Sequence, residues 1–229
     1  MHHKLIEDKS LRDRICVFRD RKEAGILLAR KLSKYKGTDS FVFGIPSGGV
    51  PVAAEIAQSL ALPLDLIIVR KIQIPYNTEA GFGAVGPDGR ILLNEELLRM
   101  LSLSDEEVEC QIQKTKEMIA IRNGLFRKNR PFPSVKNKIV IIADDGLASG
   151  YTMLSAIEYM RRQLPHILVV AVPTGLKKTI DLVLPQTDEL VCLNVRSGHT
   201  FAVADAYKMW YDLDDNDVIS ILHTFEQLP

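Results

Sequence analysis

The chain has 229 residues, of which 46% are hydrophobic and 25% are charged, and its 29 basic side chains equal its 29 acidic ones in number. This composition indicates a globular protein, and zero net charge disfavours binding to nucleic acid or an anionic membrane through overall charge. The longest apolar run, around residues 167–173, is far shorter than the roughly 20 residues of a membrane span. The N-terminal residues lack a signal-peptide core and the three cysteines are scattered, so we expect a cytoplasmic protein without a disulfide framework or zinc site.

Short apolar runs predict five β-strands, and helical periodicity between them predicts helices. The runs are rich in β-branched residues and nearly continuous, which is typical of strands that are buried on both faces of a parallel sheet. They occupy residues 41–45, 64–69, 139–143, 167–172 and 190–195, with helices expected at residues such as 52–60 and 153–164. The expected fold class is α/β, with a doubly wound, mainly parallel sheet of about five strands.

A charged helical region at residues 94–130 interrupts this alternation. Ser104 and Glu107 form a capping-box signature in front of a helical period over residues 108–126. We interpret the region as a helical insertion within a single domain that spans residues 1–229. Its basic end, residues 122–130, is interpreted as a solvated helix face rather than a nucleic-acid contact.

Two adjacent carboxylates, Asp144 and Asp145, end the third expected strand, and a loop of small residues follows them. Ligands of parallel sheets bind at the carboxyl ends of strands. The loop and the helix after it offer backbone N–H groups to a phosphate, and the carboxylates suit sugar hydroxyls or Mg²⁺ held through water. The pattern therefore predicts a site for a phosphorylated sugar such as ribose 5-phosphate.

This stretch resembles the motif with which type I phosphoribosyltransferases bind 5-phosphoribosyl 1-pyrophosphate (PRPP): an apolar strand, two acidic residues and a small-residue loop that closes with Gly-x-Thr. The layout of residues 41–211 is similar to stand-alone phosphoribosyltransferases with a helical insertion. The resemblance implies a Mg²⁺-dependent glycosyltransferase that moves phosphoribosyl from PRPP to a nucleobase-like nitrogen nucleophile and releases pyrophosphate. It implies catalytic roles for Asp144 and Asp145, which would also hold the metal through water or PRPP. The implied 5-phosphate loop is Ala148, Ser149, Gly150, Tyr151 and Thr152.

The resemblance also assigns roles to the ends of the first two strands. The implied pyrophosphate-binding residues are Ser47, Gly48, Gly49, Arg70 and Lys71. Relatives often carry arginine where this chain has Ser47, so one cation for the pyrophosphate is missing there. Lys71 and Glu79 are implied as catalytic residues near the reacting centre.

The segment of residues 72–90 is rich in glycine and polar residues, and we expect a flexible lid over PRPP. Within it, residues 81–86 match the G-x-G-x-x-G pattern of dinucleotide binding. We reject that interpretation because the pattern follows a loop rather than a strand and leads into a turn rather than a helix.

The implied hood over the acceptor is the stretch of residues 196–212. Its aromatic residues Phe201, Tyr207, Trp210 and Tyr211 could stack on a flat ring, of which Phe201, Trp210 and Tyr211 are the implied acceptor-binding residues, but packing within a small hood explains them equally well. Ala148 stands where the hypoxanthine-guanine branch carries an aspartate, which disfavours a 6-oxopurine acceptor. The expected partners are PRPP and the acceptor, with a homodimer as one option, and neither a membrane nor nucleic acid.

Two alternatives compete with the transferase. One is a non-catalytic regulator on the same fold that senses PRPP or a nucleotide, which the missing cation at Ser47 and the alanine at position 148 favour. The other is a receiver-like phosphoacceptor domain, in which the loop of residues 146–152 would serve no purpose.

Overall fold

The core of the computed structural model is a sheet of six parallel strands in the order β1-β9-β8-β7-β2-β3. The structure describes residues 4–75, 77–198 and 200–226, except for the side chains of residues 78, 79 and 226. All five predicted strands are present, and the predicted α/β fold with a mainly parallel sheet is confirmed. The strands of this sheet are β1 (Lys4–Ile6), β2 (Ser40–Gly44), β3 (Leu64–Leu66), β7 (Ile139–Ala143), β8 (Ile167–Leu176) and β9 (Glu189–Arg196). The sequence pattern missed β1, because a three-residue edge strand is too short to show a pattern.

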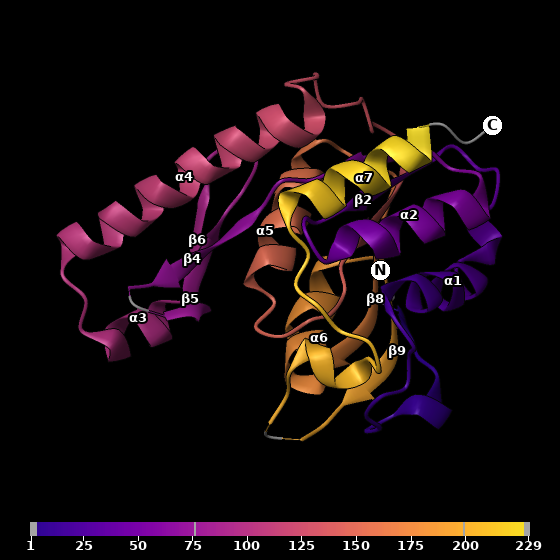
Figure 1. The fold of residues 1–229 in the computed structure, drawn as a ribbon, viewed down its shortest axis with the longest axis horizontal. Helices are drawn as coiled ribbons and strands as arrows, with labels where there is room; N and C mark the ends of the chain where they lie inside the picture. Colours follow the sequence, from indigo (N-terminus) through magenta and orange to yellow (C-terminus); the bar gives the residue numbers. More distant parts are fainter. Residues whose placement is uncertain (1–3, 76, 199, 227–229) are drawn as a thin grey trace.

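Helices cover both faces of the sheet (Figure 1). Successive residues of a strand point to opposite faces, so Ile141 packs with α1 (Arg21–Lys31) and α2 (Gly49–Leu60), whereas Ile142 packs with α5 (Tyr151–Arg162) and α6 (Lys177–Val183). Both isoleucines are fully buried, as expected for a strand with apolar residues at every position. α7 (Asp215–Glu226) lies along α2 (Figure 1). In its described part, the main body also contains short 3₁₀-helices: η1 (Lys9–Leu11), η2 (Ser33–Tyr35), η3 (Leu184–Gln186) and η4 (Val203–Ala206).

Residues 70–127 project from the main body as a separate lobe, which we call the insertion lobe (Figure 1). It contains an antiparallel sheet of three strands and two helices: β4 (Arg70–Ile74), β5 (Asn77–Val85), β6 (Ile91–Leu93), α3 (Glu95–Leu101) and α4 (Asp105–Arg127). Most of residues 72–90 form paired strands rather than an irregular loop, and the role of this segment as a lid stays a prediction. The capping box at the start of α4 is present, because the amide of Glu107 donates to the Ser104 hydroxyl and the amide of Ser104 donates to the Glu107 carboxylate.

The C-terminal half of α4 packs on the main body. Ile119 and Phe126 of this helix are buried in one cluster with Leu66 of β3. Arg127 donates two hydrogen bonds to the carboxylate of Asp65, at 2.9 and 3.0 Å. Its side chain is only 7% exposed, so the interpretation of residues 122–130 as a solvated face is wrong at this position. Within the described residues, no helix combines the length and the apolar character needed to cross a membrane.

Candidate functional site

The loops after β2 and β7 meet at the carboxyl edge of the main sheet. Their strands are paired in register up to Gly44 and Ala143, and the Pro46–Ser47 peptide bond that follows β2 is cis. A Cβ atom on Gly48 would lie 1.9 Å from a carboxylate oxygen of Asp145, and one on Gly49 would lie 2.6 Å from the carbonyl oxygen of Ala143. The two glycines therefore allow the first loop to lie directly against the acidic pair.

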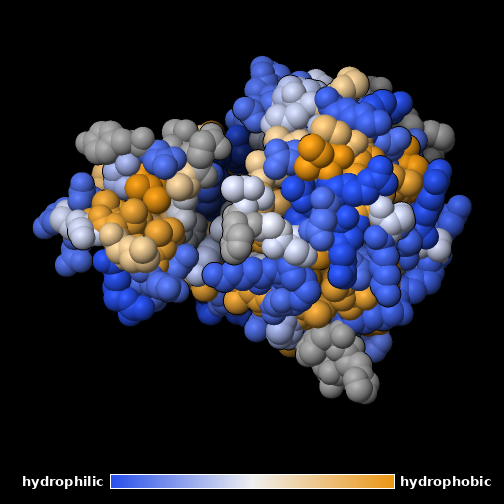
Figure 2. All heavy atoms as spheres, turned by 90° about the horizontal axis from the view of Figure 1, so that it is seen from below, coloured by the Kyte–Doolittle hydropathy of each residue, from blue (hydrophilic) through white to orange (hydrophobic). Residues whose placement is uncertain are grey.

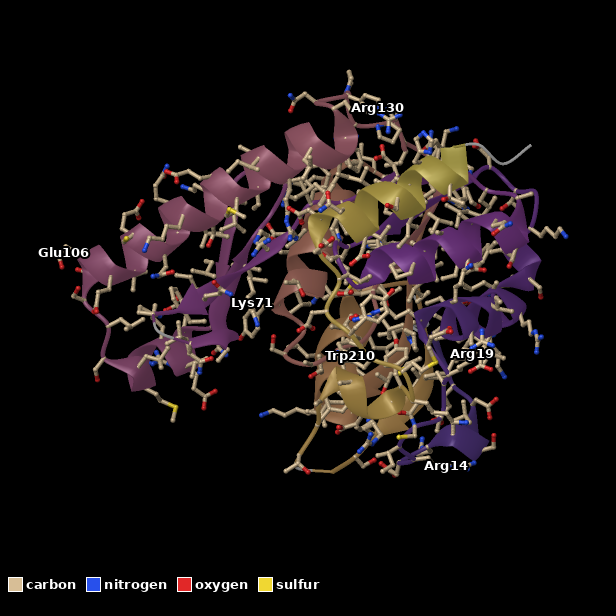
Figure 3. All side chains as sticks on the ribbon, in the orientation of Figure 1. Arg14, Arg19, Lys71, Glu106, Arg130 and Trp210 are labelled. Carbon is tan, nitrogen blue, oxygen red and sulfur yellow. The ribbon has the colours of Figure 1, made fainter. Side chains whose placement is uncertain are left out.

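A pocket of about 300 Å³ opens in front of these loops, between the main body and the insertion lobe. Figure 2 shows a hollow between the smaller lobe and the larger body, and Figure 3 shows Lys71 on the insertion-lobe side of it. The pocket brings together predicted residues from three separate segments: Gly48, Arg70, Lys71, Asp144, Asp145 and Thr152. The other residues predicted for these loops adjoin them in the chain: Ser47, Gly49, Ala148, Ser149, Gly150 and Tyr151. A larger cavity of about 430 Å³ lies on another side of α4, but its described lining residues include no carboxylate.

The two aspartates of the pocket differ in their surroundings. Burial raises the pKa of Asp144 well above its ordinary value, and the neighbouring charge of Asp145 raises this pKa further. Burial also raises the pKa of Asp145, but its ion pair with Arg21 opposes the rise. Of the two aspartates, Asp144 is therefore the one whose carboxyl group resists ionisation more strongly in the free protein. Hydroxyl donors or a cation in the pocket would favour its ionised form.

Arg21, at the start of α1, holds Asp145 from behind the pocket. Its Nε donates to the Asp145 carboxylate at 2.9 Å, and its Nη1 donates to the carbonyl oxygen of Tyr211 at 2.9 Å. The guanidinium lies 3.8 Å from the centroid of the Trp210 ring, in a cation–π arrangement. The hydroxyl of Tyr207 donates to the Asp145 carbonyl oxygen at 2.7 Å. The orientation of the second aspartate is thus fixed by residues far from it in the sequence.

The loop after Asp145 leads into α5 as the sequence pattern predicts, with the helix beginning at Tyr151. The loop is tied to β8, because the Leu147 amide donates to the Thr174 carbonyl oxygen at 2.9 Å. Gly150 has φ +85° and approaches α6 so closely that a Cβ atom would lie 2.6 Å from Thr179. No side chain of the described residues caps this helix N-terminus. Its first N–H groups and the positive end of its dipole therefore remain available to an anion.

The opposite wall of the pocket is basic. Arg70 and Lys71 at the start of β4 line it, together with Arg122 of α4. Burial lowers the pKa of Arg70, and the nearby charge of Arg122 lowers it further, while Asp215 raises it. The wall therefore gathers positive charge opposite the acidic pair.

The aromatic residues predicted to bind the acceptor do not line this pocket. Trp210 packs on Arg21 as described above, and Tyr211 is 60% exposed and borders a different cavity on the far side of Arg21. Phe201 lies about 6.0 Å from the guanidinium of Arg196. The role of these three residues stays a prediction. The side chain of Glu79 lies outside the described residues, so its predicted catalytic role also stays a prediction.

Two arginines of the site were not predicted from the sequence. Arg21 carried no signal, because its partner Asp145 is 124 residues away. The sequence pattern predicted that Arg122 lies on a solvated helix face. This prediction is wrong, because the Arg122 side chain is only 15% exposed. The apolar residues that α4 buries could have indicated that Arg122, on the same helix, has a role. They could not have indicated where Arg122 lies.

The fold is that of a type I phosphoribosyltransferase. The family model described as the phosphoribosyl transferase domain matches residues 20–208, and the chain belongs to this family.

Known relatives agree with this assignment. A protein found in two strains of Mycobacterium tuberculosis, provisionally named a phosphoribosyl transferase, is 35% identical over 206 residues. The match covers 90% of this chain and 46% of the relative, so the chain spans about half the length of the curated relatives it matches. The crystal structure of TT1426 from Thermus thermophilus is 33% identical, covers 91% of this chain and 98% of that one, and has a TM-score of 0.71. The AQ2163 protein from Aquifex aeolicus shares the fold at 14% identity, with a TM-score of 0.50 over 82% of this chain and 77% of that one.

Proposed function

We propose that the chain transfers the 5-phosphoribosyl group from PRPP to a nitrogen nucleophile of a nucleobase-like acceptor and releases pyrophosphate. The observation that carries this proposal is the meeting of three features around one pocket: the acidic pair, the uncapped N-terminus of α5 and the basic start of β4. Each of these features suits a different part of PRPP.

In this proposal the loop of residues 146–150 and the first turn of α5 bind the 5-phosphate through backbone N–H groups. Asp144 and Asp145 accept hydrogen bonds from the ribose hydroxyls. When the bond between C1 of the ribose and the pyrophosphate oxygen breaks, positive charge develops on the sugar and the two carboxylates stabilise it. Arg70 and Lys71 stabilise the negative charge of the leaving pyrophosphate.

Mg²⁺ fits this pocket as a partner of the substrate. Asp144 and Asp145 are oxygen donors of the kind Mg²⁺ prefers, and Mg²⁺ commonly binds through one or two carboxylates together with substrate phosphates. The described residues contain no group of three or more metal-ligating side chains that could hold the ion alone. When bound, Mg²⁺ supplies positive charge that neutralises the leaving group. We therefore expect it to bind with PRPP.

Calorimetric titration of Mg²⁺-PRPP tests the site. Asp144→Asn is the informative variant, because it removes one carboxylate and leaves the Arg21–Asp145 ion pair in place. We expect binding to weaken about tenfold or more, which corresponds to about 1.4 kcal/mol. Asp39→Asn is the matched control, since Asp39 is 74% exposed and precedes β2 at the opposite edge of the sheet. If Asp144→Asn binds Mg²⁺-PRPP as tightly as the wild type, the acidic pair is not the ribose site.

A regulator that binds PRPP or a nucleotide without turnover is a second candidate. The observation that favours it is the ion pair of Asp145 with Arg21, which occupies one carboxylate in the free protein. Pyrophosphate release measured with a panel of nucleobases distinguishes the two candidates. Release with one acceptor, abolished by Asp144→Asn, supports the transferase. Tight binding of PRPP without release, for every acceptor, supports the regulator.

A further inference from the structure

Arg122 occupies an unusual position for a helix side chain. It belongs to α4 of the insertion lobe, yet it lines the pocket that also contains Gly48 and Asp144 of the main body. Its side chain is 15% exposed, and its Nη2 lies 2.7 Å from a carboxylate oxygen of Asp215 in α7. Its Nε is buried and makes no hydrogen bond within the described residues. The Asp215 oxygen that faces the guanidinium also makes no hydrogen bond within the described residues. The ion pair therefore leaves polar atoms of both side chains unsatisfied, at a cost in free energy.

The surroundings of Arg122 also favour an anion. Arg122 and Arg70 line the same wall as Lys71. Burial lowers the pKa of Arg70, and the nearby charge of Arg122 lowers it further, while Asp215 raises it. On the acidic side, Asp145 is already paired with Arg21. Like charges gathered in a partly buried pocket repel each other, and a ligand with several negative charges relieves this repulsion.

The loop after β2 provides the third observation. This loop reaches the pocket at Gly48, and the residue before it, Ser47, carries no charge. The side of the pocket formed by the main body therefore offers backbone groups but no cation from this loop. α4 presents a guanidinium from the opposite side of the same pocket. A guanidinium forms paired hydrogen bonds with phosphate oxygens, which makes arginine well suited to a pyrophosphate.

From these contacts we infer that Arg122 is a pyrophosphate-binding residue, and that the insertion lobe supplies through it the cation that the loop at Ser47 lacks. The inference rests on the proposed function for the identity of the whole substrate. Asp215 competes with the pyrophosphate for the guanidinium, so that the Arg122–Asp215 ion pair sets the affinity. The insertion lobe is thus part of the substrate site.

Calorimetry with two probes tests this inference. The probes are Mg²⁺-pyrophosphate, which fills the proposed subsite alone, and ribose 5-phosphate, which fills only the remainder of the pocket. Arg122→Gln should weaken binding of Mg²⁺-pyrophosphate about tenfold or more, and leave binding of ribose 5-phosphate within about twofold. Arg122→Lys should recover part of the loss because it keeps the charge. Asp215→Asn should strengthen pyrophosphate binding.

Arg99→Gln is the matched control, because it removes the same charge from an exposed position on α3 of the same lobe. Thermal unfolding of each variant checks that it folds. A purely structural role for Arg122, through its ion pair with Asp215 and its contact with the ring of Phe126, would lower the unfolding temperature and leave pyrophosphate binding by the folded protein unchanged. That result would overturn the inference, as would an equal loss of ribose 5-phosphate and pyrophosphate binding.

Turnover measurements separate this inference from the proposed function. If the wild type releases pyrophosphate from PRPP and Arg122→Gln does so with the same KM and kcat, the transferase stands and the role of Arg122 is refuted. If pyrophosphate binding depends on Arg122 but no acceptor supports turnover, the subsite stands and the proposed transferase function fails.

Discussion

Replacing Arg21 by methionine tests the mostly buried ion pair that holds Asp145 in place. Arg21 and Asp145 are 8% and 15% exposed, and their atoms approach to 2.9 Å. The substitution keeps most of the volume of the side chain but removes its charge and its hydrogen bonds to Asp145 and Tyr211. It leaves the Asp145 carboxylate buried without its cation.

Removing one partner of a buried ion pair typically costs 3–5 kcal/mol, and about 3 kcal/mol is the appropriate figure here because both side chains keep some exposure. For a chain of this length that corresponds to a fall of roughly 6–12 °C in the unfolding temperature. The free energy of unfolding that the substitution removes depends on pH. Burial already raises the pKa of Asp145 above 3.8, and Arg21 opposes this rise. In the native state of the variant the opposing effect of Arg21 is lost, so the pKa of Asp145 is higher still. Between about pH 4 and that raised pKa, the native variant binds more protons than its unfolded chain, so its stability falls as the pH rises.

Urea unfolding at about pH 5 and about pH 8 measures this difference. Arg21→Met, Asp145→Asn and the double variant form a cycle that isolates the energy of the pair. Arg19→Met is the control, since Arg19 is 61% exposed and pairs with Asp20 at the surface, where an ion pair contributes little. An equal loss of stability at both pH values, or a cycle with no coupling energy, would show that the ion pair does not determine the state of Asp145.

Three further predictions follow from the geometry of the loops. Gly48→Ala should weaken Mg²⁺-PRPP binding in calorimetry about tenfold or more, or about 1.4 kcal/mol, because its Cβ would lie 1.9 Å from the carboxylate it faces; wild-type affinity would refute the close approach. Mg²⁺-PRPP binding should release protons and strengthen as the pH rises through the raised pKa of Asp144, because the ligand favours the ionised carboxylate. Calorimetry in two buffers of different ionisation enthalpy measures this release, and a release unchanged in Asp144→Asn would contradict it. Gly150→Ala should lower the free energy of unfolding by about 1–2 kcal/mol for its positive φ alone, and more for the contact with α6. Urea unfolding against Gly37→Ala, which has φ +67° and no neighbour within 4 Å, separates the two causes; equal losses in both variants would exclude the contact.

The main sheet could be predicted from the sequence because its strands are buried on both faces. Such strands need apolar residues at every position, and runs such as 139–143 and 190–195 have few other interpretations. The acidic loop was equally informative, since the residues that form it are contiguous. Asp144, Gly150 and Thr152 lie in a single strand-loop-helix segment, so their relative positions follow from local structure.

The antiparallel sheet of the insertion lobe could not be predicted because its glycines suggested a flexible loop. In the structure these glycines have a different purpose. A Cβ atom on Gly81 would lie 2.8 Å from the carbonyl oxygen of Ile72, and one on Gly83 would lie 2.5 Å from that of Leu92. The glycines of β5 therefore permit close pairing with both neighbouring strands. Composition alone does not distinguish a flexible glycine from one at a close contact.

The arginines of the site could not be predicted because tertiary packing, rather than local sequence, places them. Arg122 and Arg127 illustrate how this packing acts. They are five residues apart on α4, so they are separated by about 7.5 Å along the axis and point in different directions. Arg127 is paired with Asp65 of β3, which fixes the end of the helix on the main body, and Arg122 consequently lies over the pocket. The buried ion pair at one position of the helix thus positions a cation at another. A lobe that appears in the sequence as an appended helical segment is therefore held at the carboxyl edge of the sheet, where the substrate of this family is expected to bind.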